Sequence, residues 1–179
     1  MTVSSTTTAT PVGTWQLDPV HSTIGFEVAY MGGHFKGQFR EVEAELVVDE
    51  SARLSGTARV ASVDVKDETL AAHLQSPDFF DAERHPDVVF AADGLRFDGE
   101  RVAGQGEITI KGVTKPLEVE GSYAGPVPDA FGGERVRITL TATLDRTDFG
   151  VDWNAPLPSG EPALANEVRI VGELIFKAA

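Results

Sequence analysis

The amino-acid sequence predicts an all-β fold of roughly eight or nine strands, arranged as a sandwich or as a closed barrel. From residue 13 onward, apolar and polar residues alternate almost throughout, which is typical of strands with one face turned away from water. Turn-forming clusters rich in Gly, Pro, Asp and Ser separate these segments. A single segment breaks the alternation, and its residues favour a short helix.

The expected strands follow one another along the chain. Each has apolar residues at alternate positions, as in residues 22–30, where Ile24, Phe26, Val28 and Tyr30 share one face. The segments with this pattern are residues 13–18, 22–30, 41–49, 53–65, 87–97, 101–110, 117–123, 135–144 and 167–176. The glycine-rich stretches 30–37 and 125–133 are predicted to be loops or hairpin turns.

Three features favour a barrel over a sandwich, which remains the alternative. Several strands are long, and the alternation slips between Phe39 and Val42 and between Val60 and Val63, as bulges that bend a sheet toward closure would cause. Glycines also recur inside strands, where tight bends and close backbone approach require them. These glycines are Gly25, Gly56, Gly104, Gly106, Gly121 and Gly172.

The segment that breaks the strand pattern predicts one short helical insert at about residues 66–80. Its residues are good helix formers, with Leu70 and Leu74 one turn apart and an acidic first turn. Pro77 stops the helix, and Phe79 and Phe80 follow it directly. We expect the insert to lie as a flap across one end or side of the sheet. The two rings either anchor it to the sheet or line a hydrophobic mouth.

The length of the chain predicts a single domain, which an N-terminal arm precedes. The chain has 179 residues, enough to bury a substantial core, and we assign residues 13–179 to the barrel domain. Residues 1–12 are rich in Ser and Thr and are expected to form a disordered arm. This arm lacks the charged and apolar regions of a secretory signal, so the expected location is the cytoplasm.

Composition excludes several classes of partner. The formal net charge of −13 argues against nucleic acid, which requires clustered Lys and Arg. Cysteine is absent, which excludes disulfides and thiolate chemistry. No apolar run approaches the ~20 residues of a membrane-spanning helix, so no integral membrane segment is expected.

The residue pattern does not commit to catalysis or to a cofactor. The histidines His21, His34, His73 and His85 show no metal-binding spacing, and we expect no metal site. The letters DRTDFG at residues 145–150 resemble a kinase magnesium motif, but no phosphate-binding loop precedes them. One enzymatic alternative stays open, in which His73 or His21 acts as the base of a hydrolase or isomerase.

Five blocks of the sequence, in order, resemble the YceI-like family of bacterial lipocalin-like proteins. They are WQLDPVHSTIGFEV, GQFREVEAEL, HLQSPDFFDAERHPDVVF, GEITIKGVTKP and DRTDFG. The similarity extends over nearly all of residues 13–178. It implies an eight-stranded antiparallel lipocalin-like barrel whose long lumen holds a polyisoprenoid or another long-chain amphiphile, for carriage, storage or sequestration.

This chain departs from the family pattern at one place. The family usually has an Arg-Asp pair ahead of the His-Leu pair, whereas Leu70 and Ala71 stand here before His73 and Leu74. The change removes a charged pair beside the flap. It brings any polar head-group contact of that pair into question and makes the entrance more apolar.

With a barrel assumed, the apolar face of each strand is expected to face the lumen, together with three residues of the insert. The predicted ligand-binding residues are Ile24, Phe26, Val28, Tyr30, Leu46, Val60, His73, Phe79, Phe80, Phe90, Ile108, Val119, Ile138, Leu140, Ile170 and Leu174. Tyr30, His73, Lys111 and Lys115 are candidates to contact a polar head group at the mouth.

A third hypothesis treats the acidic barrel as an interaction module with a packed interior. It requires an exposed apolar patch for a protein partner. Barrel flanks and the rings of the insert can also pair in a two-fold manner, which makes a homodimer one candidate assembly.

Overall fold

A computed structural model of the protein describes residues 10–179. The strands are β1 (Gly13–Leu17), β2 (Thr23–Tyr30), β3 (Gly33–Phe39), β4 (Val42–Val48), β5 (Ala52–Arg59), β6 (Val63–Asp64), β7 (Asp87–Asp93), β8 (Arg96–Asp98), β9 (Arg101–Ile110), β10 (Val113–Pro128), β11 (Glu134–Asp145) and β12 (Leu164–Ala178). The helical segments of this range are α1 (Glu68–Gln75) and the short 3-10 helices η1 (Val60–Ser62) and η2 (Arg146–Phe149). None of the helices in this range is long and apolar enough to cross a bilayer.

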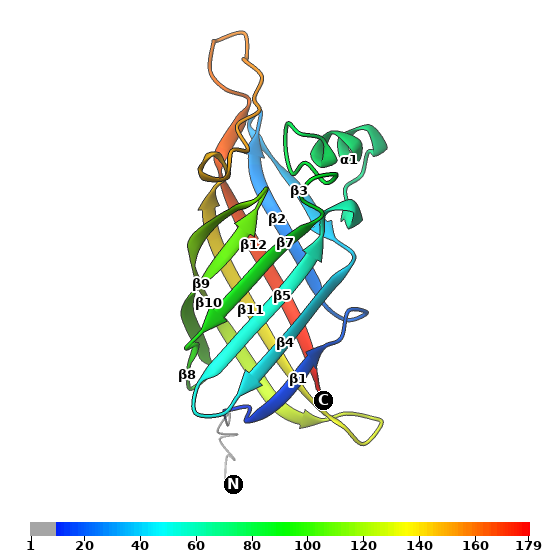
Figure 1. Ribbon diagram of the computed structural model, residues 1–179, viewed down its shortest axis with the longest axis vertical. Coiled ribbons are helices and arrows are strands. Elements are labelled where there is room, and N and C mark those ends of the chain that lie inside the picture. The colour runs from blue at the N-terminus through cyan, green and yellow to red at the C-terminus, as the bar shows by residue number, and fades with distance from the viewer. Residues whose placement is uncertain (1–9) are drawn as a thin grey trace, which may run out of the picture.

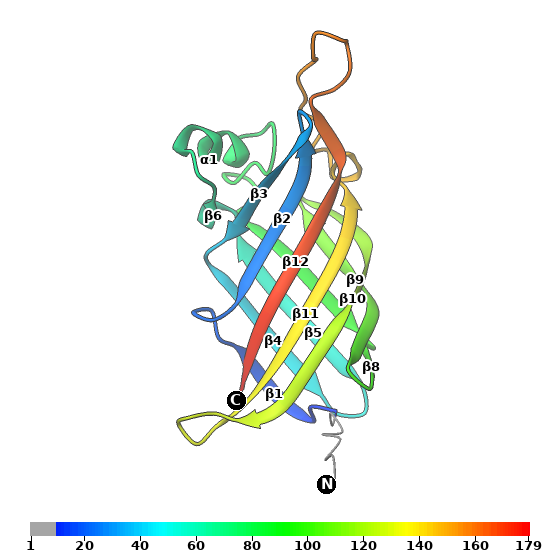
Figure 2. The ribbon, with the colours of Figure 1, turned by 180° about the vertical axis from the view of Figure 1, so that it is seen from behind.

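The strands form one antiparallel sheet that closes on itself as a barrel (Figures 1 and 2). The closed ring runs β1-β4-β5-β7-β9-β10-β11-β12 and returns to β1. The closing contact pairs Trp15 of β1 with Ala178 of β12. The predicted eight-stranded antiparallel barrel is therefore confirmed, and the sandwich is excluded.

Three of the eight positions in the ring consist of two strand segments each. β12 pairs with β1 near its end and with β2 along most of its length, so β1 and β2 share one position. β3 and β4 share the next position, and β5 and β6 share the third. The predicted slips fall at two of these breaks, because β3 ends at Phe39 and η1 separates β5 from β6.

The two glycine-rich stretches contain more strand than their composition indicates. Residues 30–37 were expected to be a loop or a hairpin; the turn is confined to residues 31–32, and β3 pairs with β2 over seven residues, from Tyr30 opposite Gly33 to Ile24 opposite Phe39. The alternation of apolar and polar residues does not reveal this strand, because Gly, His and Lys surround its two inward apolar residues, Phe35 and Phe39. The expected loop at 125–133 also begins late, since β10 extends to Pro128.

The end of the barrel near the chain termini, which we call the lower end, is filled by side chains. Leu46, Val136, Ile138 and Phe176 have no exposed surface at all. Pro11 is also fully buried, and its carbonyl oxygen accepts a hydrogen bond from the Trp15 indole N–H at 2.8 Å. Residues 10–12 of the predicted arm belong to the described part of the chain. The rest of the predicted arm, residues 1–9, lies outside the described residues.

A carboxylate at the lower end joins three segments of the chain. The Asp18 side chain, 4% exposed, accepts hydrogen bonds from Arg135 Nη1 at 2.7 Å and from the Val20 backbone N–H at 3.0 Å. His21 Nδ1 lies 2.7 Å from its Oδ2 atom, and Arg135 also donates to Asp129 at 3.2 Å. These contacts tie the loop between β1 and β2 to β11 and to the β10–β11 loop.

The helical insert begins and ends as its sequence predicts. The Asp67 side chain caps α1 by accepting from the Leu70 backbone N–H at 3.0 Å, and the helix ends at Gln75. The insert, residues 66–86, lies beside the upper end of the barrel, near β3 and β6 (Figures 1 and 2). It covers the region where β6 is too short to pair with β7.

We expect Asp18→Asn to lower the free energy of unfolding at pH 7 by about 1–3 kcal/mol, because a buried charge-assisted bond to Arg135 is weakened. The Arg135 guanidinium holds the pKa of the Asp18 carboxyl well below its usual range. This contribution is complete above the unfolded-state pKa of about 4 and is lost as the pH falls toward the folded-state pKa. Urea unfolding from pH 7 down to pH 2.5 should show the two proteins converging in stability.

The matched control for this experiment is Asp98→Asn, an exposed carboxylate on β8. Its effect should stay within about 0.5 kcal/mol at every pH. A difference between wild type and Asp18→Asn that does not shrink with acid would contradict the role given to the Asp18 charge.

Candidate functional site

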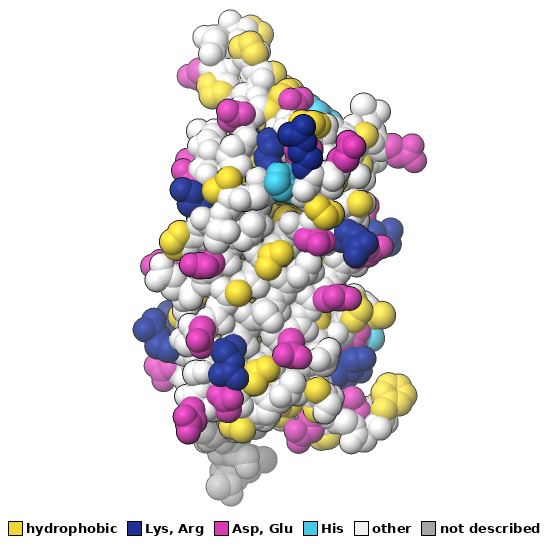
Figure 3. All heavy atoms as spheres, in the orientation of Figure 1, with side chains coloured by type: hydrophobic (Ala, Val, Ile, Leu, Met, Phe, Trp, Pro, Cys, Tyr) yellow, Lys and Arg dark blue, Asp and Glu magenta, His cyan; other side chains and the backbone are white. Residues whose placement is uncertain are grey.

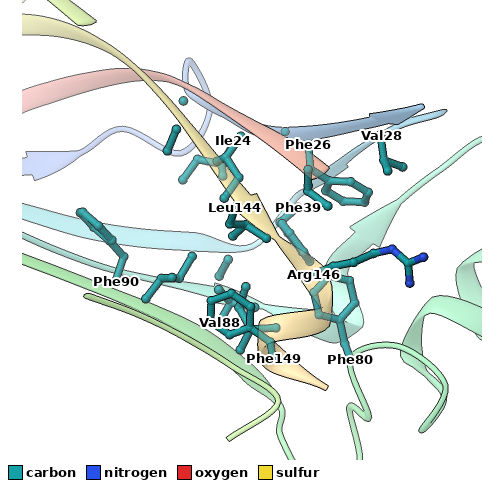
Figure 4. A pocket seen from close by; sticks show the side chains of 18 of the residues that line it. Ile24, Phe26, Val28, Phe39, Phe80, Val88, Phe90, Leu144, Arg146 and Phe149 are labelled. Carbon is teal, nitrogen blue, oxygen red and sulfur yellow. The ribbon is translucent and has the colours of Figure 1, made fainter. Parts of the chain in front are cut away.

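A cavity of about 420 Å³ occupies the interior of the barrel from the upper end downward. All eight positions of the ring contribute to its wall, and so do α1, η2 and the segment after η2. In Figure 4, side chains from β2, β3, β7 and β11 point toward one another across this space. The volume lies within the range of about 300–1,000 Å³ typical of small-molecule sites.

The wall of the cavity is almost wholly apolar. Its lining includes no Asp, Glu or Lys side chain, in the part of the chain that the structure describes. The polar side chains in the lining are those of Tyr30, Thr57, His73, Thr141 and Arg146. Such a surface favours hydrocarbon and disfavours any group that must remain hydrated.

Phe80 closes one side of the upper end by joining an aromatic cluster. Its ring centroid lies 5.7 Å from that of Phe39 and 6.4 Å from that of Phe26. Phe26 in turn lies 5.9 Å from Phe35, so the cluster connects the insert to β2 and β3. Figure 4 shows Phe26, Phe39 and Phe80 gathered at the end of the cavity nearest the insert.

Phe79 faces a different group of rings. It packs against His73 and Trp153, with centroid distances of 4.9 and 5.5 Å, and His73 and Trp153 are themselves 4.9 Å apart. His73 Nε2 also lies 3.1 Å from Asp78 Oδ2. The two adjacent phenylalanines therefore fix the insert at two places, one on β2 and β3 and one on the segment after η2. Both also line the cavity.

Glycines on neighbouring strands leave room for two of the rings that line the cavity. A Cβ atom at Gly37 would lie 2.6 Å from the Phe26 ring, and one at Gly106 would lie 2.8 Å from the Phe90 ring. Any other residue at either position would push these rings out of place. Gly106 was predicted to allow a close approach, and the structure shows that the Phe90 ring is the group that approaches it.

Arg146 holds the upper wall of the cavity together. Its side chain is 5% exposed and forms no ion pair with any described residue. Instead it donates to four backbone carbonyls, those of Val151, Trp153 and Ala165 at 2.8 Å and that of Leu164 at 3.3 Å. Burial lowers the pKa of the guanidinium, which nevertheless stays charged because an arginine does not lose its proton in proteins.

Lys111 fastens the insert from the other side. Its ammonium donates to the Pro77 carbonyl at 2.6 Å and to the Gly150 carbonyl at 3.3 Å. The β9–β10 turn, the insert and η2 are therefore joined at one point. Lys111 and Lys115, both candidates for head-group contacts, do not line the cavity.

Most of the predicted ligand-binding residues come together around this cavity. Those in its lining are Ile24, Phe26, Val28, Tyr30, His73, Phe79, Phe80, Phe90, Ile108, Val119, Leu140, Ile170 and Leu174. Three others, Leu46, Val60 and Ile138, are not in the lining. Leu46 and Ile138 belong to the packed lower end, and Val60 lies in η1, where its backbone N–H donates to Pro86.

The cavity does not reach through the lower end of the barrel. The fully buried Leu46, Val136, Ile138 and Phe176 fill that end. Alternation predicts only that these residues face inward. It cannot distinguish a residue that lines a space from one that fills it.

Sequence reasoning missed several residues of the upper wall. Phe35 and Phe39 lie in β3, which was predicted to be mostly loop, and Arg146 and Phe149 belong to the DRTDFG block. That block was identified as a family motif without a role for its residues. Leu70, one of the two residues that replace the family's charged pair, also lines the cavity, whereas Ala71 does not.

The remaining histidines lie outside the cavity. His21 is bound to Asp18 at the lower end, with a largely exposed side chain, and neither His34 nor His85 is in the lining. Within residues 10–179, no three His, Asp or Glu side chains are grouped as a metal site would require. Of the two histidines considered as the base of an enzyme, His73 is the one that lines the cavity.

The fold and this cavity have counterparts among known proteins. A family model described as YceI-like domain matches residues 15–176. This chain belongs to the YceI-like family. A UPF0312 protein of Pseudomonas putida (strain W619) is 28% identical over 137 residues, which are 73% of this chain and 71% of that protein. One from Photorhabdus laumondii is 28% identical over 158 residues, 86% and 82% of the two chains.

Solved YceI-like structures share the same barrel. The YceI protein of Campylobacter jejuni matches with a TM-score of 0.69 and 26% identity, over 81% of this chain and 85% of that one. BcnA of Burkholderia cenocepacia matches with a TM-score of 0.74 and 21% identity, over 89% and 98%. A polyisoprenoid binding domain from Saccharophagus degradans matches with a TM-score of 0.72 and 11% identity, over 92% and 98%.

We expect Arg146→Met to destabilise the protein by about 3 kcal/mol or more, because the carbonyls of Val151, Trp153 and Ala165 lose the Arg146 donor, whereas that of Leu164 keeps a bond from Asn154. Urea unfolding at pH 7 measures this change. Arg169→Met is the matched control: Arg169 is exposed on β12, and its replacement should cost less than about 0.5 kcal/mol. Equal stabilities for the two variants would show that the carbonyls around Arg146 do not need the guanidinium.

Proposed function

We propose that this protein binds the hydrocarbon tail of a polyisoprenoid or similar long-chain amphiphile in its barrel, for carriage, storage or sequestration and without catalysing a reaction. The observation that carries the proposal is the apolar cavity with contributions from all eight positions of the ring and no carboxylate in its lining. The Saccharophagus domain with the same fold is described as polyisoprenoid binding, which suggests the chemical class.

The shape of the cavity supports an extended ligand. Along β12, lining residues run from Leu164 to Leu174. Ten strand residues at ~3.3 Å each, tilted by ~40° to the barrel axis, correspond to a depth of about 25 Å. A tail of this length can enter the barrel from the upper end and stop against the packed lower end.

The energetics also favour a long chain over a short one. Each methylene group that leaves water contributes about 0.8 kcal/mol, whereas association costs at least ~4 kcal/mol. Micromolar affinity corresponds to about 8 kcal/mol, so a purely apolar ligand needs about fifteen methylene-sized groups. Because one methylene changes the binding free energy by only about 0.8 kcal/mol, roughly fourfold in affinity, selectivity among long chains is expected to be loose.

The competing proposal is an enzyme that acts on such an amphiphile with His73 as its base. His73 lines the cavity, and its ring is held by Phe79 and Trp153 with Asp78 at 3.1 Å. If His73→Ala abolished a measurable turnover of a bound amphiphile, this proposal would replace simple binding. If His73→Ala altered only ligand affinity, binding would stand.

We expect Gly172→Leu to weaken binding of a long-chain isoprenoid by roughly tenfold or more, because a leucine there occupies space otherwise available to the tail. Gly172 lines the cavity between Ile24 and Leu140, and a Cβ atom there meets nothing closer than 3.6 Å. The variant should therefore fold normally. Titration with geranylgeraniol, followed by tryptophan fluorescence, gives the affinity, and native mass spectrometry reports any co-purified ligand.

Ala91→Leu is the matched control, since Ala91 is exposed on the outer face of β7. It adds comparable volume outside the barrel and should bind like the wild type. Unchanged affinity in Gly172→Leu, or wild-type protein that neither retains nor binds any long-chain ligand, would overturn the proposal.

A further inference from the structure

Two neighbouring turns extend the barrel at its upper end. The loop formed by residues 154–163 projects beyond the barrel, and the β2–β3 turn lies against its base (Figures 1 and 2). The Met31 backbone N–H donates to the Ala163 carbonyl at 3.0 Å, and Tyr30 pairs with Leu164. We call residues 30–33 and 154–163 together the upper tip.

The upper tip is apolar and nearly uncharged, in a protein whose net charge is −13. Glu161 is its single charged residue. Met31 is 57% exposed and Tyr30 is 37% exposed, and the three prolines of the loop are exposed as well. Figure 3 shows hydrophobic side chains on this projection, whereas acidic and basic groups are scattered over the barrel wall below it.

Most backbone N–H groups of the loop are hydrogen-bonded within the protein. Among residues 155–163, Pro156, Pro158 and Pro162 have no N–H group. The N–H groups of Leu157, Gly160 and Ala163 donate to backbone carbonyls within the loop, and those of Ala155 and Glu161 donate to the Asn154 and Ser159 side chains. Ser159 is the residue of this stretch whose N–H has no such bond. Inserting the loop into a layer of low polarity would therefore leave few unpaired N–H donors, which removes part of the cost of such insertion.

The tip is continuous with the cavity. Tyr30 at its edge lines the cavity and is also partly exposed, and Trp153 and Leu164, which flank the projecting loop, line the cavity too. The upper end of the cavity therefore reaches the surface next to the tip. Tyr and Trp are the side chains enriched where proteins meet the headgroup region of a bilayer.

We propose that the upper tip docks on an electrically neutral, zwitterionic lipid surface and places the upper end of the cavity at that surface. The lack of Lys and Arg on the tip, together with the acidity of the whole chain, disfavours anionic lipids. The opposite end of the barrel also exposes an aromatic ring, Phe131, but Asp129, Glu134 and Arg135 surround it in sequence. This inference rests on the proposed function for its purpose, but the contact itself can be measured without a ligand in the cavity.

The test uses the full chain and vesicles of phosphatidylcholine, with and without phosphatidylglycerol, in a flotation assay. We expect wild-type protein to float with phosphatidylcholine vesicles and less with the anionic mixture. Met31→Asp and Leu157→Asp should each reduce flotation roughly tenfold or more, because an apolar contact is replaced by a charge. Met31 has a positive φ of 45°, a conformation that aspartate tolerates, so this variant should fold.

Phe131→Asp is the matched control: it removes the most exposed aromatic ring, at the other end of the barrel, and should float like the wild type. The inference is overturned if wild-type protein does not float, if Phe131→Asp loses as much as Met31→Asp, or if both tip variants float normally. Light scattering in which Met31→Asp abolishes a wild-type dimer would assign the tip to a second copy of the chain and would equally overturn it. The ligand content of the same samples distinguishes the proposed ligand binding from the proposed docking. Protein that retains ligand but does not float would contradict the docking contact alone.

Discussion

Closure of the sheet is the constraint on which the rest of this molecule depends. In the closed ring β1-β4-β5-β7-β9-β10-β11-β12, each strand has partners on both sides, so the fold is held by backbone pairing around its circumference. A sandwich is stable only when the side chains of its two sheets fill the space between them. A closed barrel can leave part of its interior open, and this one leaves an apolar space of about 420 Å³.

The two ends of the barrel are stabilised in different ways. At the lower end, apolar side chains such as Leu46 and Phe176 fill the interior, and Asp18 joins loops on the outside. At the upper end, Arg146 organises carbonyls, Lys111 fastens the insert, and the rings of Phe79 and Phe80 hold it on two different surfaces. The polar groups of the upper end stabilise the wall, and no carboxylate of the described residues lines the cavity.

The sequence predicts the outline of this structure well, because alternation depends only on which face of a strand avoids water. It predicted the barrel, a helical insert at about residues 66–80 that contains α1 (Glu68–Gln75), and a set of inward residues most of which line the cavity. It missed β3, whose inward side chains are too few to form a pattern. It also could not separate Leu46 and Ile138 from true lining residues, since packing depends on neighbours distant in sequence. Arg146 was unpredictable for the same reason: its four partners are brought to it by the fold.

If the barrel holds a lipid tail as proposed, its closed lower end determines the order of events when one ligand replaces another. A tail inside a blind tube can depart only by the route of its arrival, so one occupant has to withdraw before another is admitted. The polar end of the ligand then stays at the open upper end of the cavity, where an acceptor molecule can contact it. Residence time, and not the rate of encounter, would in that case limit how quickly cargo is handed over.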